Sequence, residues 1–387
     1  MSLTVEQRDW LTLALIPGVG GTRMVKLLAR FGKPRRALEA SLAELEEVLG
    51  SALARRVHAY REVSEVEEQA ARMRDYEAWL LTLDDERYPL SLAEIYDPPV
   101  VLWGRGALEE ADACAVAIVG TRHATEYGLR VARQFAGDLA ARGVTVVSGL
   151  AAGIDTVAHE AALAAGGRTI AVLGNGVDVV FPAENAALMH RILQRGCVLS
   201  PFAMGTQGFR GNFPVRNRII SGLSLGTLVV EAPPGSGALI TARDAAEQGR
   251  QVFAVPGPIT HRNSRGPHDL IKEGAKLVET VDDILVELNL PSALRQPPAV
   301  PSSAAGRQDL LPGAEPVPAA AAKPQPARPA LSPVESAVVA SLSGEGSFVD
   351  EIALVCRIPV SEALSTLTLL ELKGVVRQLS GKRFAPK

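Results

Sequence analysis

The sequence predicts an α/β protein in which a parallel sheet domain lies between a helical domain and a small carboxyl-terminal domain. Three observations support this. Apolar residues recur at helical spacing over residues 1–78, and short β-branched runs alternate with helical stretches over 79–290. A Pro/Ala-rich stretch at 291–332 then precedes a last segment at 333–387. Alternating strands and helices are typical of a parallel sheet covered by helices on both faces.

Composition limits the classes of protein to which this chain can belong. Its 387 residues, 47% of them hydrophobic, are enough for two or three domains with buried cores. The formal net charge of −3 argues against a polybasic surface, so a nucleic-acid site must be a local basic pocket. The first residues lack a basic region followed by an apolar run, and no later run is long enough to cross a bilayer. We therefore expect a cytoplasmic protein with no membrane insertion.

Several catalytic classes lack their motifs. The three cysteines, Cys114, Cys197 and Cys356, have no CxxC spacing, which favours reduced thiols over a zinc site or a disulfide framework. No GxxxxGK[ST] sequence of a P-loop ATPase occurs, and the glycines at 174–176 lack the third glycine of the dinucleotide fingerprint. We therefore expect no catalytic residue, no metal, no cofactor and no enzymatic activity.

A glycine-rich hairpin joins two predicted helices near the amino terminus. Residues 16–22, IPGVGGT, lie between apolar helical runs, and Lys26 and Arg30 follow in the second helix. The segment resembles a helix-hairpin-helix motif, whose backbone N–H groups can bind a phosphate at a helix start. A tight interhelical turn that needs only the conformational freedom of glycine explains the same residues. The sequence leaves both interpretations open.

The clearest strands of the middle domain end in glycine-bearing turns. Strands are expected at 116–119, 144–148, 169–173, 227–230 and 252–255. Turns that contain glycine follow at 120–122, 148–149, 174–176 and 233–237. Because parallel strands end at the same edge of a sheet, these turns should line one crevice, where helix amino ends favour an anion.

The same crevice receives basic residues that suit a phosphate. Arg122 follows the first turn, and 216–218, Arg-Asn-Arg, stand at a predicted helix start. A guanidinium can bind a phosphate through two parallel hydrogen bonds. The predicted DNA contacts are Gly120, Thr121, Arg122, Ser148, Gly149, Gly174, Phe213, Arg216, Asn217 and Arg218.

Two features of this crevice stay open. The arginines have a structural alternative, in which they pair with Asp155, Asp178 or Glu231 and hold loops in place. Stacking on a base would need an exposed aromatic ring, and the chain offers only Phe181, Phe209 and Phe213 nearby. Each of these phenylalanines is equally compatible with a place in the core.

The last two segments differ in character. The composition of 291–332 cannot bury enough apolar surface to offset chain entropy, which predicts a disordered linker. Residues 333–387 give the order of helices and a terminal hairpin of a winged helix, with Ser380-Gly381 as the turn. The presumed recognition helix, 361–373, carries Glu362 and Glu371, so we favour contact with a protein over reading of duplex DNA.

Seven blocks of the middle domain resemble one family in the correct order. They are TLDDERYPLSLAEIYDPPVVLWGRG, AIVGTRHATEYG, VVSGLAAGIDTVAHEAAL, TIAVLGNGVDVVFPAEN, NFPVRNRIISGLS, VVEAPPGSGALITARDAAEQGRQVFAVPG and LIKEGAKLV. These blocks are similar to those of the DprA (DNA-processing protein A, or Smf) family. The end segment LTLLELKGVVRQLSGKRF also resembles the winged-helix tail that many members carry.

The resemblance implies a fold and a function. The fold would be an extended Rossmann-like sheet domain, an amino-terminal domain similar to SAM or helix-hairpin-helix domains, and a carboxyl-terminal winged helix. The function would be to bind and protect incoming single-stranded DNA and to load RecA past single-strand-binding protein in natural transformation and homologous recombination. Members act as homodimers. The implied dimer or RecA surface includes His268, Ile271 and Leu277.

Two other functions remain as alternatives. The crevice could bind or cleave a nucleotide derivative, which would require a positioned carboxylate from Asp155, Asp178 or Glu231. The winged helix could instead read duplex DNA and make the protein a regulator, although the acidic helix 361–373 speaks against this.

Overall fold

A computed structural model describes residues 3–60, 63–290 and, with short gaps, 338–386. The gaps in the last part are 340, 343–346, 357, 361–362, 364, 368–369, 371–374 and 380–382. The chain divides into two compact units, residues 1–302 and 303–387. The predicted linker at 291–332 lies outside the described residues.

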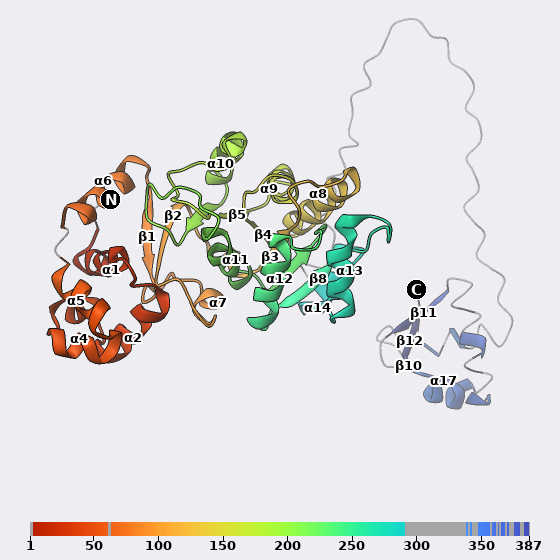
Figure 1. Ribbon diagram of the computed structural model, residues 1–387. Coiled ribbons are helices and arrows are strands. Elements are labelled where there is room, and N and C mark those ends of the chain that lie inside the picture. The colour runs from red at the N-terminus through yellow and green to blue at the C-terminus, as the bar shows by residue number, and fades with distance from the viewer. Residues whose placement is uncertain are drawn as a thin grey trace, which may run out of the picture. The chain divides into compact units, whose positions relative to one another are not determined.

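The amino-terminal part of the first unit is a bundle of short helices (Figure 1). They are α1 (Val5–Leu15), α2 (Gly21–Phe31), α3 (Pro34–Glu39), α4 (Leu42–Leu49), α5 (Ser51–Ala59) and α6 (Val63–Asp75). Thr4 and Ser41 form capping boxes at the starts of α1 and α4, which fix where these helices begin. Trp10, Met24 and Leu27 are buried between the helices. The predicted hairpin between α1 and α2 is confirmed.

A nine-stranded sheet follows, in the order β1-β2-β6-β5-β4-β3-β7-β8-β9. Its strands are β1 (Trp79–Thr82), β2 (Val101–Gly106), β3 (Ala115–Val119), β4 (Thr145–Ser148), β5 (Thr169–Val172), β6 (Cys197–Ser200), β7 (Gly226–Val229), β8 (Gln251–Ala254) and β9 (Lys276–Leu277). The five predicted strands are present. The sheet is not wholly parallel, however, because β1 and β2 add an antiparallel edge beside β6.

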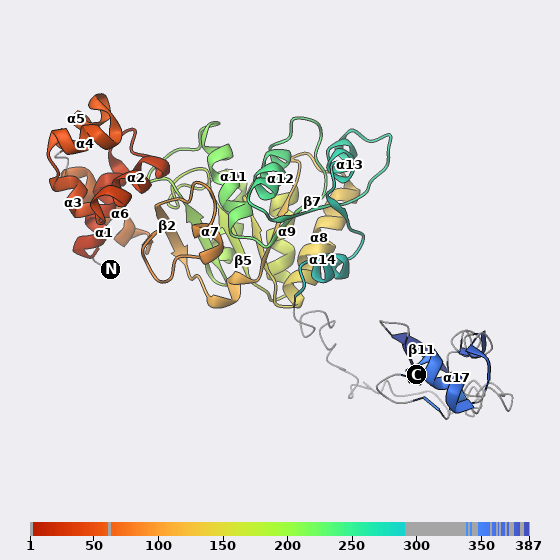
Figure 2. The same cartoon turned by 90° about the horizontal axis from the view of Figure 1, so that it is seen from below.

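Helices cover both faces of the sheet (Figure 2). They are α7 (Leu90–Ala93), α8 (Glu126–Ala141), α9 (Ile154–Ala164), α10 (Ala186–Leu193), α11 (Asn212–Gly222), α12 (Gly237–Glu247), α13 (Arg265–Lys272) and α14 (Val281–Glu287), with short 3₁₀ turns at η1 (Glu110–Ala113), η2 (Ala183–Asn185) and η3 (Arg262–Ser264). Residues of α8, α9 and α14 share one core with the sheet, and residues of α7, α11 and α12 share the other. A third core joins the helical bundle to α10 and the β1–β2 edge.

The strand order reverses direction at β3. Chain order runs outward from β3 through β4, β5 and β6 on one side, and β7 begins the other side. Ligands of open α/β sheets bind at such a point, outside the carboxyl ends of the strands. The topology therefore predicts a ligand-binding site between the carboxyl ends of β3 and β7.

The second unit has a small sheet of its own. Its described elements are β10 (Ser347–Phe348), α17 (Val349–Cys356), β11 (Val376–Leu379) and β12 (Arg383–Pro386), with the strands in the order β10-β12-β11. The antiparallel pairing of β11 with β12 confirms the predicted hairpin. The predicted turn residues Ser380 and Gly381 lie outside the described residues, as does much of the predicted helix 361–373.

The described residues contain neither a membrane-spanning helix nor a cluster of metal ligands. No helix within residues 3–60, 63–290 and the described parts of 338–386 is long and apolar enough to cross a bilayer. No group of three His, Cys, Asp or Glu side chains in this part of the chain is arranged to hold a metal ion. The three cysteines are free.

Candidate nucleic-acid interface

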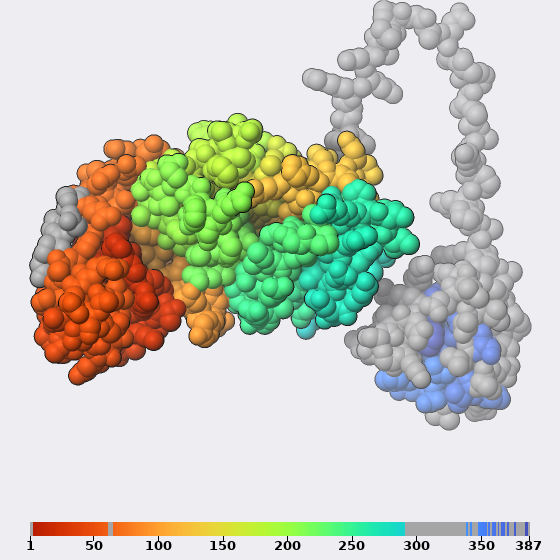
Figure 3. Space-filling view, viewed as in Figure 1, coloured from red at the N-terminus to blue at the C-terminus, as the bar shows by residue number. Residues whose placement is uncertain are grey.

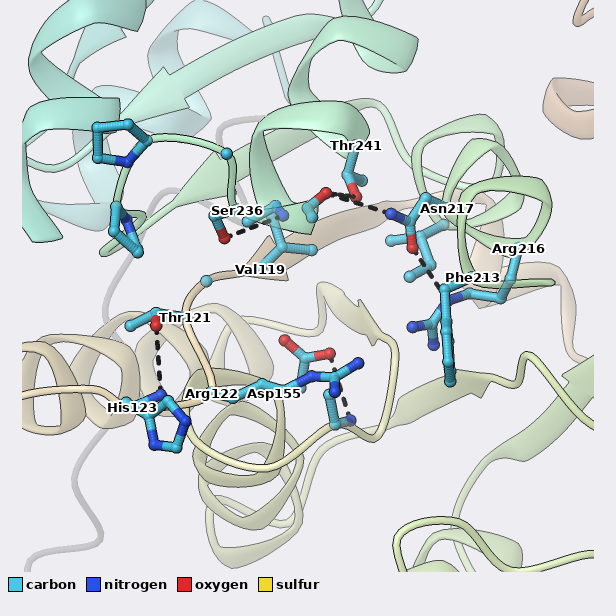
Figure 4. Close-up of a pocket in the computed structure, with 18 residues that line it drawn as sticks. Val119, Thr121, Arg122, His123, Asp155, Phe213, Arg216, Asn217, Ser236 and Thr241 are labelled. Atoms are coloured by element: carbon cyan, nitrogen blue, oxygen red, sulfur yellow. Dashed lines mark hydrogen bonds between the residues drawn. The ribbon is translucent and has the colours of Figure 1, made fainter. Parts of the chain in front are cut away.

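A cavity of about 330 Å³ lies where the strand order reverses. Its walls come from the turn after β3, the first turn of α11 and the start of α12 (Figure 4). The space-filling view is hollowed where the gold, green and teal segments meet (Figure 3). Thr121 donates its backbone N–H to the Glu231 carbonyl oxygen at 2.7 Å, which holds the turn after β3 against the chain that leaves β7. The glycine-bearing turns predicted to share one edge of the sheet do so.

Arg216 is a buried cation at the floor of this cavity. Its side chain is 5% exposed, and its Nη1 donates to the carbonyl oxygens of Gly149 at 2.6 Å and Val172 at 2.5 Å. Within the described part of the chain, Arg216 forms no ion pair with a carboxylate. A side chain on Gly149 would overlap the guanidinium, so glycine is required there. Buried arginines are rare unless an anion pairs with them, so the Arg216 guanidinium is a group that could bind an anion at this site.

Arg122 and Phe213 extend the site toward solvent. Arg122 is exposed, forms no hydrogen bond or ion pair with other described residues, and places its Cζ 5.4 Å from the centre of the Phe213 ring. Arg216 approaches the same ring at 5.8 Å. Cations near an aromatic face are attracted to its quadrupole, so both arginines help to hold the ring in place. Two guanidinium groups and one aromatic ring thus form a single surface.

A smaller cavity of about 70 Å³ adjoins the first across Phe213. Phe181 lies on its other side, with ring centres of Phe181 and Phe213 6.0 Å apart and planes inclined by 36°. Gly174 lets the Phe213 ring lie close to the backbone, because a Cβ at 174 would be 2.9 Å from Phe213 Cδ1. The predicted glycines 149 and 174 line this second cavity.

Burial and charge act against each other at the cavity floor. Burial, with a smaller contribution from the neighbouring charge of Arg122, lowers the pKa of Arg216 to about 10, and the Asp155 carboxylate opposes this shift. Burial also raises the pKa of the Asp155 carboxyl, against Arg216 and two backbone hydrogen bonds. Burial is the largest cause of the lowered pKa of Arg216, because it removes water from the charged guanidinium. A bound phosphate would bring a negative charge close to this group and so stabilise its charged form.

The carboxylates considered as partners for the arginines have other hydrogen-bond partners, although Asp155 also lines the larger cavity. Asp155 accepts from the backbone N–H groups of Gly149 at 3.1 Å and Ala151 at 3.4 Å. Glu231 accepts from the backbone and hydroxyl of Thr125. Asp178 accepts from the Gly205 N–H at 2.8 Å and pairs with Arg72 in the helical bundle. Asp155 influences Arg216 through space, but none of the three forms an ion pair with the predicted arginines.

Most of the predicted contacts gather around the two cavities, and two do not. Gly120, Thr121, Arg122, Phe213, Arg216 and Asn217 line the larger cavity. Ser148 is buried and donates its hydroxyl to the Ile118 carbonyl oxygen at 2.6 Å, so it supports the strands. Arg218 points away from the cavity and pairs with Asp97, a partner 121 residues distant in sequence. Its placement follows from helix periodicity, since residues two apart do not share a face.

Sequence reasoning missed several lining residues. His123, Thr241 and Ile220 line the larger cavity, and Pro182 lines the smaller one. His123 immediately follows Arg122, which was a usable signal, whereas Thr241 enters from the second turn of α12 and has no local motif. Ser236 caps α12 by accepting from the Ala238 N–H at 3.4 Å.

The residues predicted for a dimer or RecA surface lie at the β9 edge of the sheet. Leu277 is 42% exposed in β9, which is the last strand of the sheet. Ile271 is half-buried in α13, and the ring Nε2 of His268 lies 3.0 Å from the Gly257 carbonyl oxygen.

Comparison with known proteins decides the family. The model of the DNA recombination-mediator protein A family matches residues 79–289, and that of the DprA winged helix domain matches 322–382. The chain belongs to the DprA/Smf family. Protein Smf of Synechocystis sp. is 34% identical over 98% of both chains, and DNA processing protein DprA of Streptococcus pneumoniae is 47% identical over 52% of this chain and 72% of that protein. The predicted family and fold class, including the winged helix, are confirmed.

Two solved structures of the DprA/Smf family resemble this chain. The DNA processing protein A of Streptococcus pneumoniae is 36% identical, with a TM-score of 0.64 over 74% of this chain and 99% of that one. The second is DNA processing protein A of Helicobacter pylori, whose structure is described in terms of a single-stranded DNA binding mode. It is 29% identical, with a TM-score of 0.50 over 55% of this chain and 96% of that one.

Proposed function

We propose that this chain binds single-stranded DNA, without sequence preference, in the cleft formed by Arg122, Phe213 and Arg216. The observation that carries the proposal is Arg216, a buried cation that lies at the floor of an open cavity and has no ion pair with a carboxylate among the described residues. The family is one of DNA-processing proteins, and the Helicobacter pylori relative is described as binding single-stranded DNA.

The contacts divide by chemistry. Arg122 and Arg216 would hold phosphate oxygens, and the amino end of α12 at Ser236–Gly237 offers backbone N–H groups to a further charge. Phe213 would stack on a base, with Phe181 beside it. A base in a duplex is already stacked and paired, so an aromatic contact of this kind favours the single strand.

Membership of the family supports a proposal for the wider role. We propose that the protein protects incoming single-stranded DNA in the cytoplasm and loads RecA onto it past single-strand-binding protein, in natural transformation and homologous recombination. We also propose that it acts as a homodimer and performs no catalysis. The carboxylates of Asp178 and Glu231 support the absence of catalysis, because both oxygens of each are engaged by other residues, and a general acid or base needs a carboxyl group free to meet the substrate.

The experiment is fluorescence anisotropy of labelled single- and double-stranded oligonucleotides over a salt series. We expect the single strand to bind more tightly. Arg122→Ala should weaken binding and reduce the slope of log K against log salt by about 0.7, the value for one phosphate contact on a single strand. Arg133→Gln removes an equal charge from α8, outside the residues that line the cleft, and is the matched control.

Each contrary result has a meaning. Preference for duplex would favour the winged-helix regulator. Equal effects of Arg122→Ala and Arg133→Gln would show that the cleft is not the DNA site. Displacement of the oligonucleotide by micromolar mononucleotide would favour the nucleotide-binding alternative.

A further inference from the structure

The amino end of α2 has a carboxylate partner from a distant segment. α2 has no side-chain cap of its own at Gly20. Asp97, in the segment between α7 and β2, accepts from the Thr22 hydroxyl at 3.2 Å. A Cβ on Gly21 would lie 2.7 Å from the same Asp97 oxygen, so the carboxylate sits directly against the helix start. A negative charge is favoured there by the unpaired N–H groups of the first turn.

The second oxygen of Asp97 joins another element. It pairs with the Arg218 guanidinium on α11, the helix that carries Phe213 and Arg216. The Asp97 and Arg218 side chains are 24% and 26% exposed, so solvent screens this pair less than it screens a surface pair. One carboxylate thus links the helical bundle to the helix that forms one wall of the cleft.

The same segment also contacts the far end of α11. A Cβ on Gly222 would lie 2.8 Å from Leu92 Cδ1 and 3.1 Å from Ile95 Cγ2. The Ser91 carbonyl oxygen accepts from Arg250, just beyond α12, at 2.8 Å. α11 is therefore held at Arg218 by charge and at Gly222 by close packing, and these two contacts fix its rotation about its own axis.

We propose that Asp97 is a positioning residue for the cleft, and that the hairpin at 16–22 serves as its docking point. The inference rests on the proposed function, because the property affected is affinity for single-stranded DNA. The hairpin presents its helix start to Asp97 and so does not offer it to a phosphate. Arg218 acts by orienting α11, which sets where Phe213 and Arg216 meet the strand.

The sign of the effect separates positioning from simple electrostatics. Asp97→Asn removes a negative charge, and on charge alone it would tighten binding of a polyanion. A positioning role predicts the reverse. Affinity for single-stranded DNA should fall about fivefold, which is at the lower end of the effects that one site usually has on binding at another. The salt slope should stay unchanged, because no phosphate contact is removed. Glu86→Gln, which removes an exposed charge from the turn before α7, is the control.

A glycine pair tests the contact by size alone. Gly21→Ala places a methyl group against the Asp97 carboxylate, whereas nothing lies within 4 Å of a Cβ at Gly20. We expect Gly21→Ala to weaken binding of a labelled oligothymidylate as Asp97→Asn does, and Gly20→Ala to bind as the wild type. Thermal unfolding of each full-length variant verifies that the compared proteins are folded.

Amide hydrogen exchange of α11 gives a readout without DNA. Faster exchange at 219–223 in Asp97→Asn and Gly21→Ala, together with weaker DNA binding, supports the proposal. Tighter binding with a steeper salt slope in Asp97→Asn overturns it, because Asp97 would then only mask Arg218. Binding equal to the controls also overturns it. If the wild type does not bind single-stranded DNA, the proposed function fails. In that case, unchanged amide exchange of α11 in the two variants would also reject the link between Asp97 and α11.

Discussion

Arg216 and Arg218 are two positions apart in one helix and have different partners. Arg216 faces the cleft and is held by carbonyl oxygens, while Arg218 faces the helical bundle and pairs with Asp97. Residue type and spacing predicted that both would bind phosphate. Burial distinguishes them, because Arg216 lies in a desolvated position and no carboxylate in the described part of the chain is bonded to it.

Phe213 carries a prediction about stacking. Phe213→Leu keeps apolar volume but removes the aromatic face, and loss of one stacked base costs about 1–3 kcal/mol. We expect affinity for a single strand to fall about tenfold or more, with the salt slope unchanged because no charge is lost. Phe213→Tyr retains the face and should bind nearly as the wild type. Anisotropy titrations measure both, and equal affinities of the leucine and tyrosine variants would contradict stacking.

His159 carries a prediction about acid stability. It is fully buried in α9 with Nδ1 2.7 Å from the Thr169 hydroxyl, and burial lowers its pKa from 6.5 to about 3. The unfolded chain therefore binds a proton that the folded chain does not, and stability contributed by this group falls as pH drops below 6.5 toward 3.

The check is denaturant unfolding at several pH values for wild type and His159→Gln. The difference between them isolates this residue from its titrating neighbour Asp155. The wild type should lose up to about 1.4 kcal/mol more per pH unit than the variant in that window. Parallel stability curves would show that His159 does not titrate on unfolding.

At the scale of elements, local sequence patterns predict the strands and turns that depend on nearby residues alone. The β-branched runs gave β3, β4, β5, β7 and β8 within about one residue of their bounds. The sequence does not single out β1, β2, β6 or β9, and the antiparallel direction of β2 depends on its pairing with β6 far along the chain. The glycine turns were found because each follows a buried strand.

The site shows the same division at residue level. Gly120, Thr121 and Arg122 share one turn, and sequence order alone brings them together. The pairing of Arg218 with Asp97 and the approach of Thr241 depend on how α11 and α12 pack, which no local motif encodes. The hydrogen bond from the Thr125 hydroxyl to the Glu231 carboxylate likewise joins residues 106 positions apart.

Helix α8 offers a matched pair of glycines. A Cβ at Gly128 would lie 2.5 Å from the Glu231 carboxylate, while at Gly137 the nearest atom is 4.0 Å away. Gly128→Ala should destabilise the fold by about 1–3 kcal/mol, because Glu231 must leave Thr125. Gly137→Ala should stabilise it by up to about 1 kcal/mol, since alanine favours a helix interior. Urea unfolding compares them, and similar changes would exclude a close contact at Gly128.

At the scale of the whole molecule, a chain of net charge −3 still presents a local cationic cleft. Arg122 and Arg216 lie there without ion pairs in the described part, so their charges are not cancelled by bonded carboxylates. A field of this kind acts over about 8–10 Å at moderate salt. Binding should therefore depend on the cleft and not on the overall charge.

The β9 edge carries a prediction about assembly. Leu277 is exposed in the last strand of the sheet, and an open strand edge with an apolar side chain favours pairing. If the proposed homodimer uses this edge, Leu277→Asp should shift the protein toward monomer in light scattering after gel filtration. Ile259→Asp changes a side chain that is 86% exposed in the loop after β8 and should leave the mass unchanged. An unaltered mass in Leu277→Asp would place any dimer surface elsewhere.

Photo-crosslinking tests the central claim most directly. The full-length protein is irradiated with a single-stranded oligonucleotide that carries 5-iodouracil, and crosslinked peptides are identified by mass spectrometry. Binding in the cleft predicts crosslinks at Phe213 or Phe181, lost in excess unlabelled single strand and retained in excess mononucleotide. Crosslinks confined to residues 1–78 or 338–386 would contradict the account, because the strand would then avoid the cleft of Arg122 and Arg216.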